Sequence, residues 1–249
     1  MKVVFLGATK GMGRALARLM AERGDRIFLL GREAADLERS ARDLEARGPG
    51  GDPAATVGTS PCDLEKPATF APALAAAEAA LGGFDAVVAT AGAFATQEAL
   101  EADPALAERV LTVDFAHTVL FCEEARRRLL ARGGGTLCVF SSVAGERGRK
   151  PVVLYGAAKA GLSHYLEGLD HRFHAQGLRV VCVKPGFVRT SMTEGLPRPP
   201  FAGEPEGVAR AVLRAIDRGT PVVYVPGIWR LVMAVIRALP RFVMRKVGF

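Results

Sequence analysis

The sequence predicts an α/β domain in which helices cover both faces of a seven-stranded parallel sheet. Short apolar runs alternate with longer segments of helical periodicity along the 249 residues, and this alternation is typical of repeated strand–helix units. A composition of 49% hydrophobic and 24% charged residues suits one large core. We expect one domain over residues 1–226 and a separate extension over residues 227–249.

The individual elements follow one another in regular order. The apolar strand segments are expected at residues 2–6, 26–31, 56–62, 84–90, 135–141, 178–184 and 221–225. The helical segments between them are expected at residues 11–24, 33–47, 65–81, 104–131, 154–176 and 204–218. In an open sheet of this kind, ligands bind beyond the carboxyl ends of the strands, so we expect the functional residues in the segments that follow the strands.

The first strand leads directly into a glycine-rich turn, Gly7-Ala8-Thr9-Lys10-Gly11-Met12-Gly13. The next residues have the i, i+3, i+4, i+7 apolar spacing of a helix, at Met12, Ala15, Leu16 and Leu19. At such a helix N-terminus the backbone N–H groups and the helix dipole favour an anion, and missing Cβ atoms let it approach closely. Gly7, Gly11 and Gly13 therefore predict a phosphate-binding turn.

Tyr155 and Lys159 are four residues apart, and Ser142 lies thirteen positions before the tyrosine. On a helix this spacing puts the phenol and the ammonium on one face, where the positive charge would lower the pKa of the phenol. Reduction of a carbonyl, or its reverse, needs such a group, because an alkoxide that develops on oxygen must take up a proton. Tyr155 would be the general acid/base, and Ser142 would fix the substrate oxygen. The alternative is an ordinary solvated helix.

Together with the glycine turn, this pattern resembles the short-chain dehydrogenase/reductase family over nearly the whole chain. Two further segments are similar to family motifs, Cys62-Asp63-Leu64 and Pro185-Gly186-Phe187-Val188-Arg189-Thr190. The resemblance implies a doubly wound, Rossmann-like catalytic domain and a nicotinamide dinucleotide cofactor. It also implies a homo-oligomer, a dimer or a tetramer, formed through the helices at 104–131 and 154–176.

The resemblance further assigns residues to the cofactor and to the chemistry. Asp63 and Leu64 would contact the adenine, and Thr190 would hold the nicotinamide carboxamide. The residues implied to be catalytic are Ser142, Tyr155, Lys159 and Asp114. The residues implied to bind the cofactor are Gly7, Thr9, Lys10, Gly11, Met12, Gly13, Arg32, Asp63, Leu64, Ala91, Gly92, Tyr155, Lys159, Pro185, Gly186, Val188 and Thr190.

Two positions depart from the family pattern. Thr90-Ala91-Gly92 stands where the family usually has Asn-Ala-Gly, and Asp114 stands where a helix usually offers Asn to a water relay. The family generally holds the relay water with the backbone carbonyl of that residue, which any residue possesses. We therefore expect proton transfer to survive, with a carboxylate placed near Lys159.

The charges near the end of the second strand indicate the cofactor. Arg32 follows Leu29-Leu30-Gly31 where an NAD-binding protein would place an acid on the ribose 2′-hydroxyl, and a cation there suits a 2′-phosphate. Lys10 adds a second cation beside the glycine turn. These residues predict NADP(H), and the alternative is that both are surface cations with no ligand.

The C-terminal extension carries most of the net charge of +7. Residues 228–249 contain no acid, and their cations are Arg230, Arg237, Arg241, Arg245 and Lys246. The segment 228–239 has the pattern of a helix that Pro240 should end, and it is too short and too charged to span a bilayer. A basic amphipathic segment with Trp and Phe is typical of a membrane interface. Packing on the domain, over the substrate cleft or against another subunit is the alternative.

The charge balance and the cysteines argue against a nucleic-acid role and against a metal site. Without its tail the chain is near neutrality, so we expect no nucleic-acid role. The four cysteines show no metal-ligand spacing, so we expect buried free thiols, no metal, and a cytoplasmic protein that attaches peripherally to the inner face of the membrane. The predicted activity is NADPH-dependent interconversion of a ketone or aldehyde and an alcohol, on a hydrophobic or lipid-linked substrate. A non-catalytic NADP(H)-binding regulator or scaffold is the rival.

Overall fold

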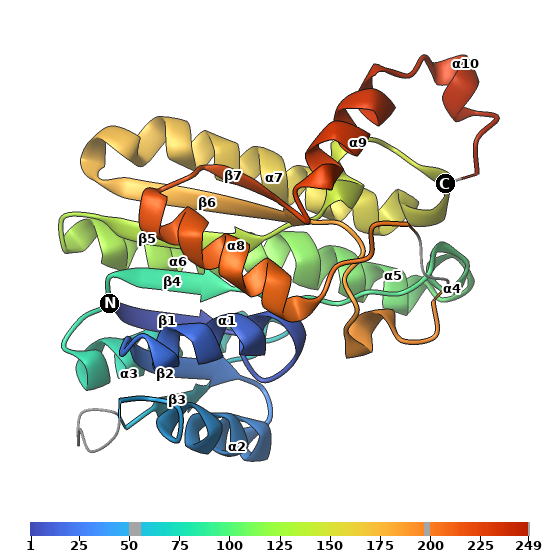
Figure 1. Cartoon of the computed structure of the whole chain (residues 1–249). Helices are drawn as coiled ribbons and strands as arrows, with labels where there is room; N and C mark the ends of the chain where they lie inside the picture. The colour runs from blue at the N-terminus through green and yellow to red at the C-terminus, as the bar shows by residue number, and fades with distance from the viewer. Residues whose placement is uncertain (50–55, 197–199, 249) are drawn as a thin grey trace.

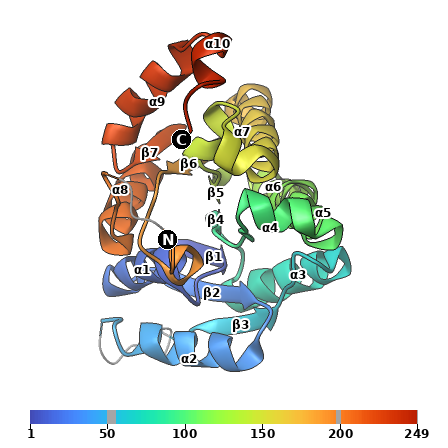
Figure 2. The same cartoon turned by 90° about the vertical axis from the view of Figure 1, so that its right-hand side faces the viewer.

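The computed structural model describes residues 1–49, 56–196 and 200–248. Its centre is one parallel sheet in the order β3-β2-β1-β4-β5-β6-β7 (Figure 1). The strands are β1 Lys2–Leu6, β2 Arg26–Gly31, β3 Gly58–Pro61, β4 Ala86–Ala89, β5 Gly135–Phe140, β6 Leu178–Pro185 and β7 Val222–Val225. The predicted fold class and strand count are confirmed. All seven strands end at the same edge of the sheet, which Figure 2 views nearly end-on.

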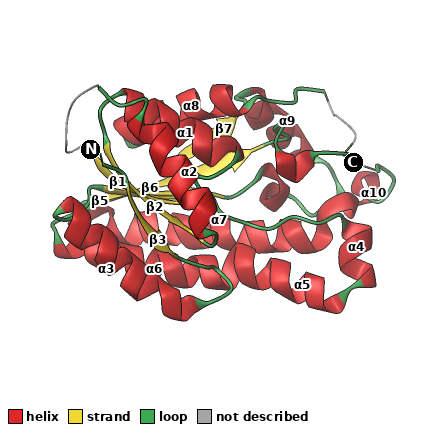
Figure 3. Cartoon of the chain, turned by 90° about the horizontal axis from the view of Figure 1, so that it is seen from below, coloured by secondary structure: helices red, strands yellow, loops and turns green. Residues whose placement is uncertain are grey.

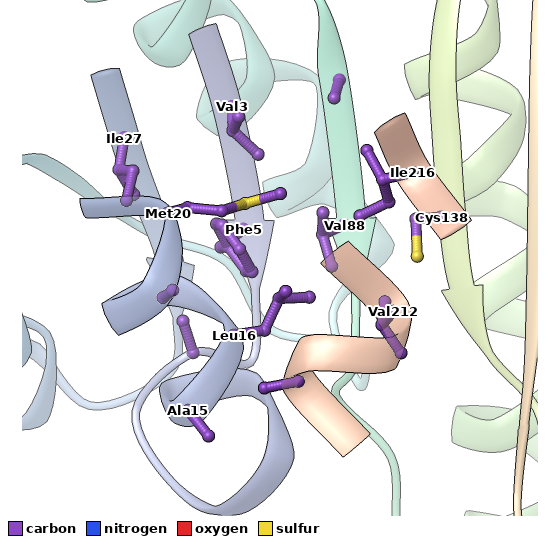
Figure 4. Packing of buried hydrophobic residues seen from close by; sticks show 14 of the residues in the cluster. Val3, Phe5, Ala15, Leu16, Met20, Ile27, Val88, Cys138, Val212 and Ile216 are labelled. Atoms are coloured by element: carbon purple, nitrogen blue, oxygen red, sulfur yellow. The ribbon is translucent and has the colours of Figure 1, made fainter. Parts of the chain in front are cut away.

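Two layers of helices cover the sheet, one on each face (Figure 3). The first layer contains α1 Gly11–Glu22, α2 Ala34–Glu45 and α8 Pro205–Arg218. The second contains α3 Phe70–Leu81, α6 Thr118–Ala131 and α7 Val153–Phe173. Alternate residues of β1, β2, β4, β5 and β6 enter opposite cores, because successive side chains of a strand point to opposite faces. Figure 4 shows the first core, where Phe5 and Val88 of the sheet meet Leu16 of α1 and Val212 of α8.

The helix predicted over 104–131 is helical throughout but is not a single α-helix. It consists of α5 Pro104–Leu111, a π-helical turn at Thr112–His117, and α6. The Thr118 hydroxyl donates a hydrogen bond of 2.6 Å to the Val113 carbonyl inside this turn. Such π turns frequently occur at functional sites, and this one carries Asp114. A short helix that the sequence pattern did not predict, α4 Gln97–Ala102, precedes it and is capped by Thr96.

The C-terminal extension forms α9 Ile228–Ala238 and α10 Arg241–Met244, which Pro240 separates as predicted. One side of α9 is buried, because Met233 and Ile236 pack against Val143. The opposite side leaves large apolar residues in solvent, with Leu231 64% and Val235 57% exposed. None of the helices in the described ranges is both long enough and apolar enough to traverse a bilayer.

Candidate active site

The carboxyl edge of the sheet brings together the residues of the predicted catalytic group. Lys159, on α7, is 4% exposed, and Asp114, in the π turn, is fully buried. The Lys159 Nζ lies 3.2 Å from Asp114 Oδ1 and 3.4 Å from the carbonyl oxygen of Phe140. The same Asp114 oxygen accepts a hydrogen bond of 3.0 Å from the Ala93 backbone N–H. The substituted aspartate is therefore the direct ion-pair partner of Lys159.

Tyr155 lies beside both this ion pair and Ser142. The Lys159 Nζ is 5.6 Å from the centre of the Tyr155 ring, and the Phe94 ring meets the same ring edge-on at 5.1 Å between centroids. The Ser142 hydroxyl is held by the loop around it, since it accepts from the Ala144 N–H at 3.0 Å and donates to the Pro185 carbonyl at 3.4 Å. The Ser142 hydroxyl also interacts with the Tyr155 phenol and acts to lower its pKa, so Ser142, Tyr155 and Lys159 are neighbours.

Burial and charge act in opposite directions on these groups. Burial raises the pKa of Tyr155, and the nearby Asp114 carboxylate adds to it, although Lys159 and the Ser142 hydroxyl act to lower it. Burial alone would lower the pKa of Lys159, but Asp114 and Tyr155 outweigh it and raise that pKa. Lys159 acts to lower the Tyr155 pKa, as its position on α7 predicts, but burial and Asp114 outweigh this effect. The larger of the two raising effects is desolvation, and the second is the Asp114 carboxylate that the sequence placed near Lys159.

Gly92 provides the space for the ion pair. A Cβ atom on Gly92 would lie 2.5 Å from Asp114 Oδ1 and 3.5 Å from Lys159 Nζ. Any side chain at this position would displace the carboxylate.

The glycine turn forms a cradle with no room for side chains. A Cβ on Gly7 would lie 2.5 Å from the Ala91 backbone nitrogen, and one on Gly13 would lie 2.3 Å from the Gly7 carbonyl oxygen. Gly11 has φ of +53°, which glycine adopts without strain. Within the described ranges no side chain caps the N-terminus of α1, so its first N–H groups face the turn without a side-chain acceptor. These features fit a bound pyrophosphate.

Comparison with known proteins agrees with this geometry. A family model described as short chain dehydrogenase matches residues 1–199. The chain belongs to the short-chain dehydrogenase/reductase family. An uncharacterized oxidoreductase of Mycobacterium tuberculosis is 36% identical, in a match that covers 98% of this chain and 96% of the relative. A cis-4-hydroxycyclohexanecarboxylate dehydrogenase of Sinomonas cyclohexanicum is 33% identical, covering 84% and 86%.

The solved structures support the fold of this short-chain dehydrogenase/reductase. A short-chain type dehydrogenase/reductase from Mycobacterium ulcerans superposes with a TM-score of 0.78 at 24% identity, covering 89% of this chain and 86% of that one. The chain is therefore an oxidoreductase of a family that acts on alcohol and carbonyl groups and binds a nicotinamide dinucleotide.

The residues predicted to meet the adenosine end lie around the ends of β2 and β3. Arg32 is 54% exposed and forms an ion pair of 3.2 Å with Glu65, and Arg109 binds the same carboxylate at 2.7 Å. Lys10 lies 3.8 Å from Asp36. Asp63 accepts the Glu65 N–H at 3.0 Å, and the Leu64 carbonyl contacts the His117 ring at 2.6 Å. The two predicted phosphate cations therefore each have an acidic neighbour, which the sequence pattern did not indicate.

The segment after β6 reaches back toward the glycine turn. A Cβ on Gly11 would lie 3.3 Å from the Thr190 methyl group, and Thr190 forms a reciprocal capping box with Thr193. Val188 is 2% exposed and bridges to Gly203. Thr9 and Met12 lie within the glycine turn itself.

No role was predicted from the sequence for several residues that lie at the site. Thr90, in place of the family Asn, donates a hydrogen bond of 2.8 Å to the Gly7 carbonyl and so holds the turn against β4. Glu146, in the loop after Ser142, is bound by Arg237 of α9 at 3.0 Å and by the Tyr224 hydroxyl at 3.1 Å. Trp229 covers the Cα of Gly186. The last two contacts join segments far apart in the chain, so no local pattern could reveal them.

Proposed function

We propose that this protein is an NADPH-dependent reductase of a ketone or aldehyde, or the corresponding alcohol dehydrogenase. The observation that carries the proposal is the placement of the Tyr155 phenol beside Lys159 and Ser142, at the sheet edge where the glycine cradle also lies. A single catalytic unit over 1–226, extended by 227–249, is part of the proposal.

Each residue then has a defined task. A bound nicotinamide supplies or accepts the hydride at the substrate carbon. Tyr155 donates its proton to the substrate oxygen during reduction and accepts one during oxidation, while Ser142 donates a hydrogen bond that positions this oxygen. Lys159 stabilises the tyrosinate left behind, and Asp114 holds the Lys159 ammonium.

The residues proposed to bind the dinucleotide would do so through backbone groups or through charged side chains. Gly7, Gly11 and Gly13, with Thr9, Lys10 and Met12, would hold the pyrophosphate. Ala91 and Gly92 would lie along the dinucleotide, and Pro185, Gly186, Val188 and Thr190 would hold the nicotinamide. Arg32 and Lys10 would bind a ribose 2′-phosphate, with Asp63 and Leu64 at the adenine. A dianionic phosphate competes well with one carboxylate for a guanidinium, so the pairing of Arg32 with Glu65 leaves NADP(H) the favoured cofactor.

The C-terminal extension supports a class of substrate and a location of the protein at the membrane. The exposed apolar side of α9, together with the cations of α9 and α10, suits peripheral contact with anionic lipid at the inner face of the cytoplasmic membrane. A hydrophobic or lipid-linked substrate fits this position, and the name of the Sinomonas relative supports an alicyclic alcohol or ketone group as the reacting part. A homo-oligomer is part of the same proposal. We place the substrate between Ser142, Tyr155 and the segment 187–204, of which residues 197–199 lie outside the described residues.

The experiment is a panel of ketones and aldehydes with NADPH, followed by loss of its absorbance, with wild type and Tyr155→Phe. Removing the phenol proton should reduce kcat by about 10²-fold or more, whereas the dissociation constant for NADPH should change far less, because the glycine turn and the other cofactor residues are intact. Turnover by Tyr155→Phe at the wild-type rate would remove the proposed mechanism. Tight NADPH binding with no turnover of any carbonyl would favour a regulator.

A further inference from the structure

A short 3₁₀ turn, Val143–Glu146, begins directly after Ser142. The Ser142 hydroxyl accepts a hydrogen bond of 3.0 Å from the Ala144 N–H, so the serine is the N-cap of the turn. A displacement of the turn would therefore move this hydroxyl, which interacts with the Tyr155 phenol. The way the turn is held thus decides the geometry between these two oxygens.

One side of the turn rests on α7, the helix that carries Tyr155, with backbone against backbone. A Cβ on Gly145 of the turn would lie 2.6 Å from the Ala160 nitrogen. A Cβ on Gly156 of α7 would lie 2.9 Å from the Ala144 carbonyl oxygen. Any larger residue at either position would push the turn away from α7. The two glycines therefore permit the close approach but supply no side chain that could maintain it.

The other side of the turn is covered by the C-terminal extension. Val143 is buried with Met233 and Ile236 of α9. The Arg147 guanidinium, just beyond the turn, donates a hydrogen bond of 3.0 Å to the Leu239 carbonyl. Farther along, a groove of about 1040 Å³ lies between α9 and the C-terminal half of α7. The serine turn therefore lies between the two helices, and α9 holds it against α7.

Glu146, the last residue of the turn, joins it to three other elements. Its side chain is 5% exposed, and it pairs with Lys184 of β6. The Tyr224 hydroxyl of β7 donates to its Oε2 at 3.1 Å, and the Arg237 guanidinium of α9 donates to the same oxygen at 3.0 Å. A buried carboxylate requires such partners, and hydrogen bonds to a charged group are strong. The Glu146 carboxylate is thus the point where β6, β7 and α9 all hold the serine turn.

We propose that Glu146 is a positioning residue, whose carboxylate keeps the Ser142 hydroxyl at the Tyr155 phenol and at the substrate oxygen. This inference rests on the proposed function and deepens it. The effect of Glu146 on the reaction is indirect, since its own partners are the three donors from β6, β7 and α9. Arg237 acts through Glu146, so the C-terminal extension has a part in placing the reacting groups, in addition to its proposed contact with lipid.

The test is reduction by NADPH of cyclohexanone, or of the carbonyl compound in the panel that wild type reduces fastest, in the full-length protein. Glu146→Gln keeps the shape of the side chain and removes its charge. We expect kcat to fall about tenfold or more, whereas the dissociation constant for NADPH should change less than about twofold. Arg237→Gln should lower kcat by a smaller factor, because Lys184 and Tyr224 still hold Glu146. Arg230→Gln, at another exposed arginine of α9, is the matched control and should behave like wild type.

A double-mutant cycle with Ser142→Ala separates positioning of the serine from a general loss of structure. If Glu146 acts through the serine hydroxyl, Glu146→Gln should change kcat by less than about twofold once that hydroxyl has been removed. An equal loss in the wild-type and Ser142→Ala backgrounds, or no loss in either, would overturn the positioning role and leave the proposed function standing.

Hydrogen exchange gives a second readout that needs no turnover. The amides of residues 143–147 should exchange about threefold faster or more in Arg237→Gln than in wild type, and at the wild-type rate in Arg230→Gln. Equal exchange in all three proteins would overturn the hold of α9 on the turn, whatever the kinetics show. If wild type reduced no carbonyl of the panel, the proposed function would fall, and the positioning role with it.

Discussion

The cofactor side and the substrate side of this site are built by different means. On the cofactor side, the turn from Gly7 to Gly13 is made of backbone, and the atoms around Gly7 and Gly13 leave no space for a Cβ. On the substrate side, the loop after Ser142 is held by side chains of α9, such as the pair of Arg237 with Glu146, whose residues are 91 positions apart. The first side is therefore a local property of the sequence, and the second is a property of the tertiary structure.

The largest effect that would sharpen this contrast is expected from Gly13→Ala. Its Cβ would lie 2.3 Å from the Gly7 carbonyl and 2.4 Å from Thr90 Oγ1, and neither the backbone nor the packed threonine can yield without opening the turn. We expect the dissociation constant for NADPH to rise by about 100-fold or more, and the melting temperature to fall by about 4 °C or more. NADPH fluorescence titration and thermal unfolding measure the two effects.

Gly148→Ala is the matched control for this variant. Apart from Gly148 and its two chain neighbours, no atom of the described residues lies within 4 Å of a Cβ placed on Gly148, so both quantities should remain at their wild-type values. Normal NADPH binding by Gly13→Ala would mean that the turn is not the pyrophosphate site.

The next largest effect concerns the adenosine end, where Arg32→Asp should exchange the cofactor preference. The substitution puts a second carboxylate near the expected 2′-phosphate, beside Glu65, which then keeps only Arg109 of its two arginine partners. We expect the ratio of kcat/KM for NADPH over NADH to fall by about 10- to 100-fold, since a charge-assisted contact is replaced by repulsion. The control is Arg214→Asp, which changes an exposed arginine on α8 and should leave the ratio unchanged. If Arg32→Asp also left the ratio unchanged, the cofactor would be one without the 2′-phosphate.

The first of these tests concerns a part of the molecule that the sequence predicted well. The positions of the strands, the glycine turn and the grouping of Ser142, Tyr155 and Lys159 were accessible because apolar runs, missing Cβ atoms and helical spacing are local signals. The π turn that buries Asp114 could not be predicted, because one extra residue in a helical turn does not produce a recognisable spacing of apolar residues. The partners of Arg32 and the place of α9 depend on contacts between distant segments, so charge and amphipathicity indicated only that partners of some kind were required.

The tail should give a smaller effect, of about tenfold. Leu231 on α9 is 64% exposed, and placing it in a lipid interface would contribute about 1–1.5 kcal/mol. Leu231→Ser should therefore weaken binding to vesicles of phosphatidylglycerol and phosphatidylcholine about tenfold in a sedimentation assay. Leu120→Ser on α6, where the leucine is 51% exposed, should bind like wild type. Equal behaviour of the two variants would assign the apolar side of α9 to something other than lipid.

The smallest change in rate is expected where the two sides meet, at Asp114. Its carboxylate raises the pKa of Tyr155 together with burial, so Asp114→Asn should lower that pKa. Alcohol oxidation needs the unprotonated phenol, and its rate should therefore reach half of its maximum at a lower pH than in wild type, whereas the reduction rate should begin to decline at a lower pH. We expect kcat at neutral pH to stay within about tenfold of wild type, or ~1.4 kcal/mol. A shift of the pH profile for oxidation to higher pH would mean that Lys159, without its partner at 3.2 Å, has lost its proton. A fall in kcat by several orders of magnitude would make Asp114 part of the proton relay itself.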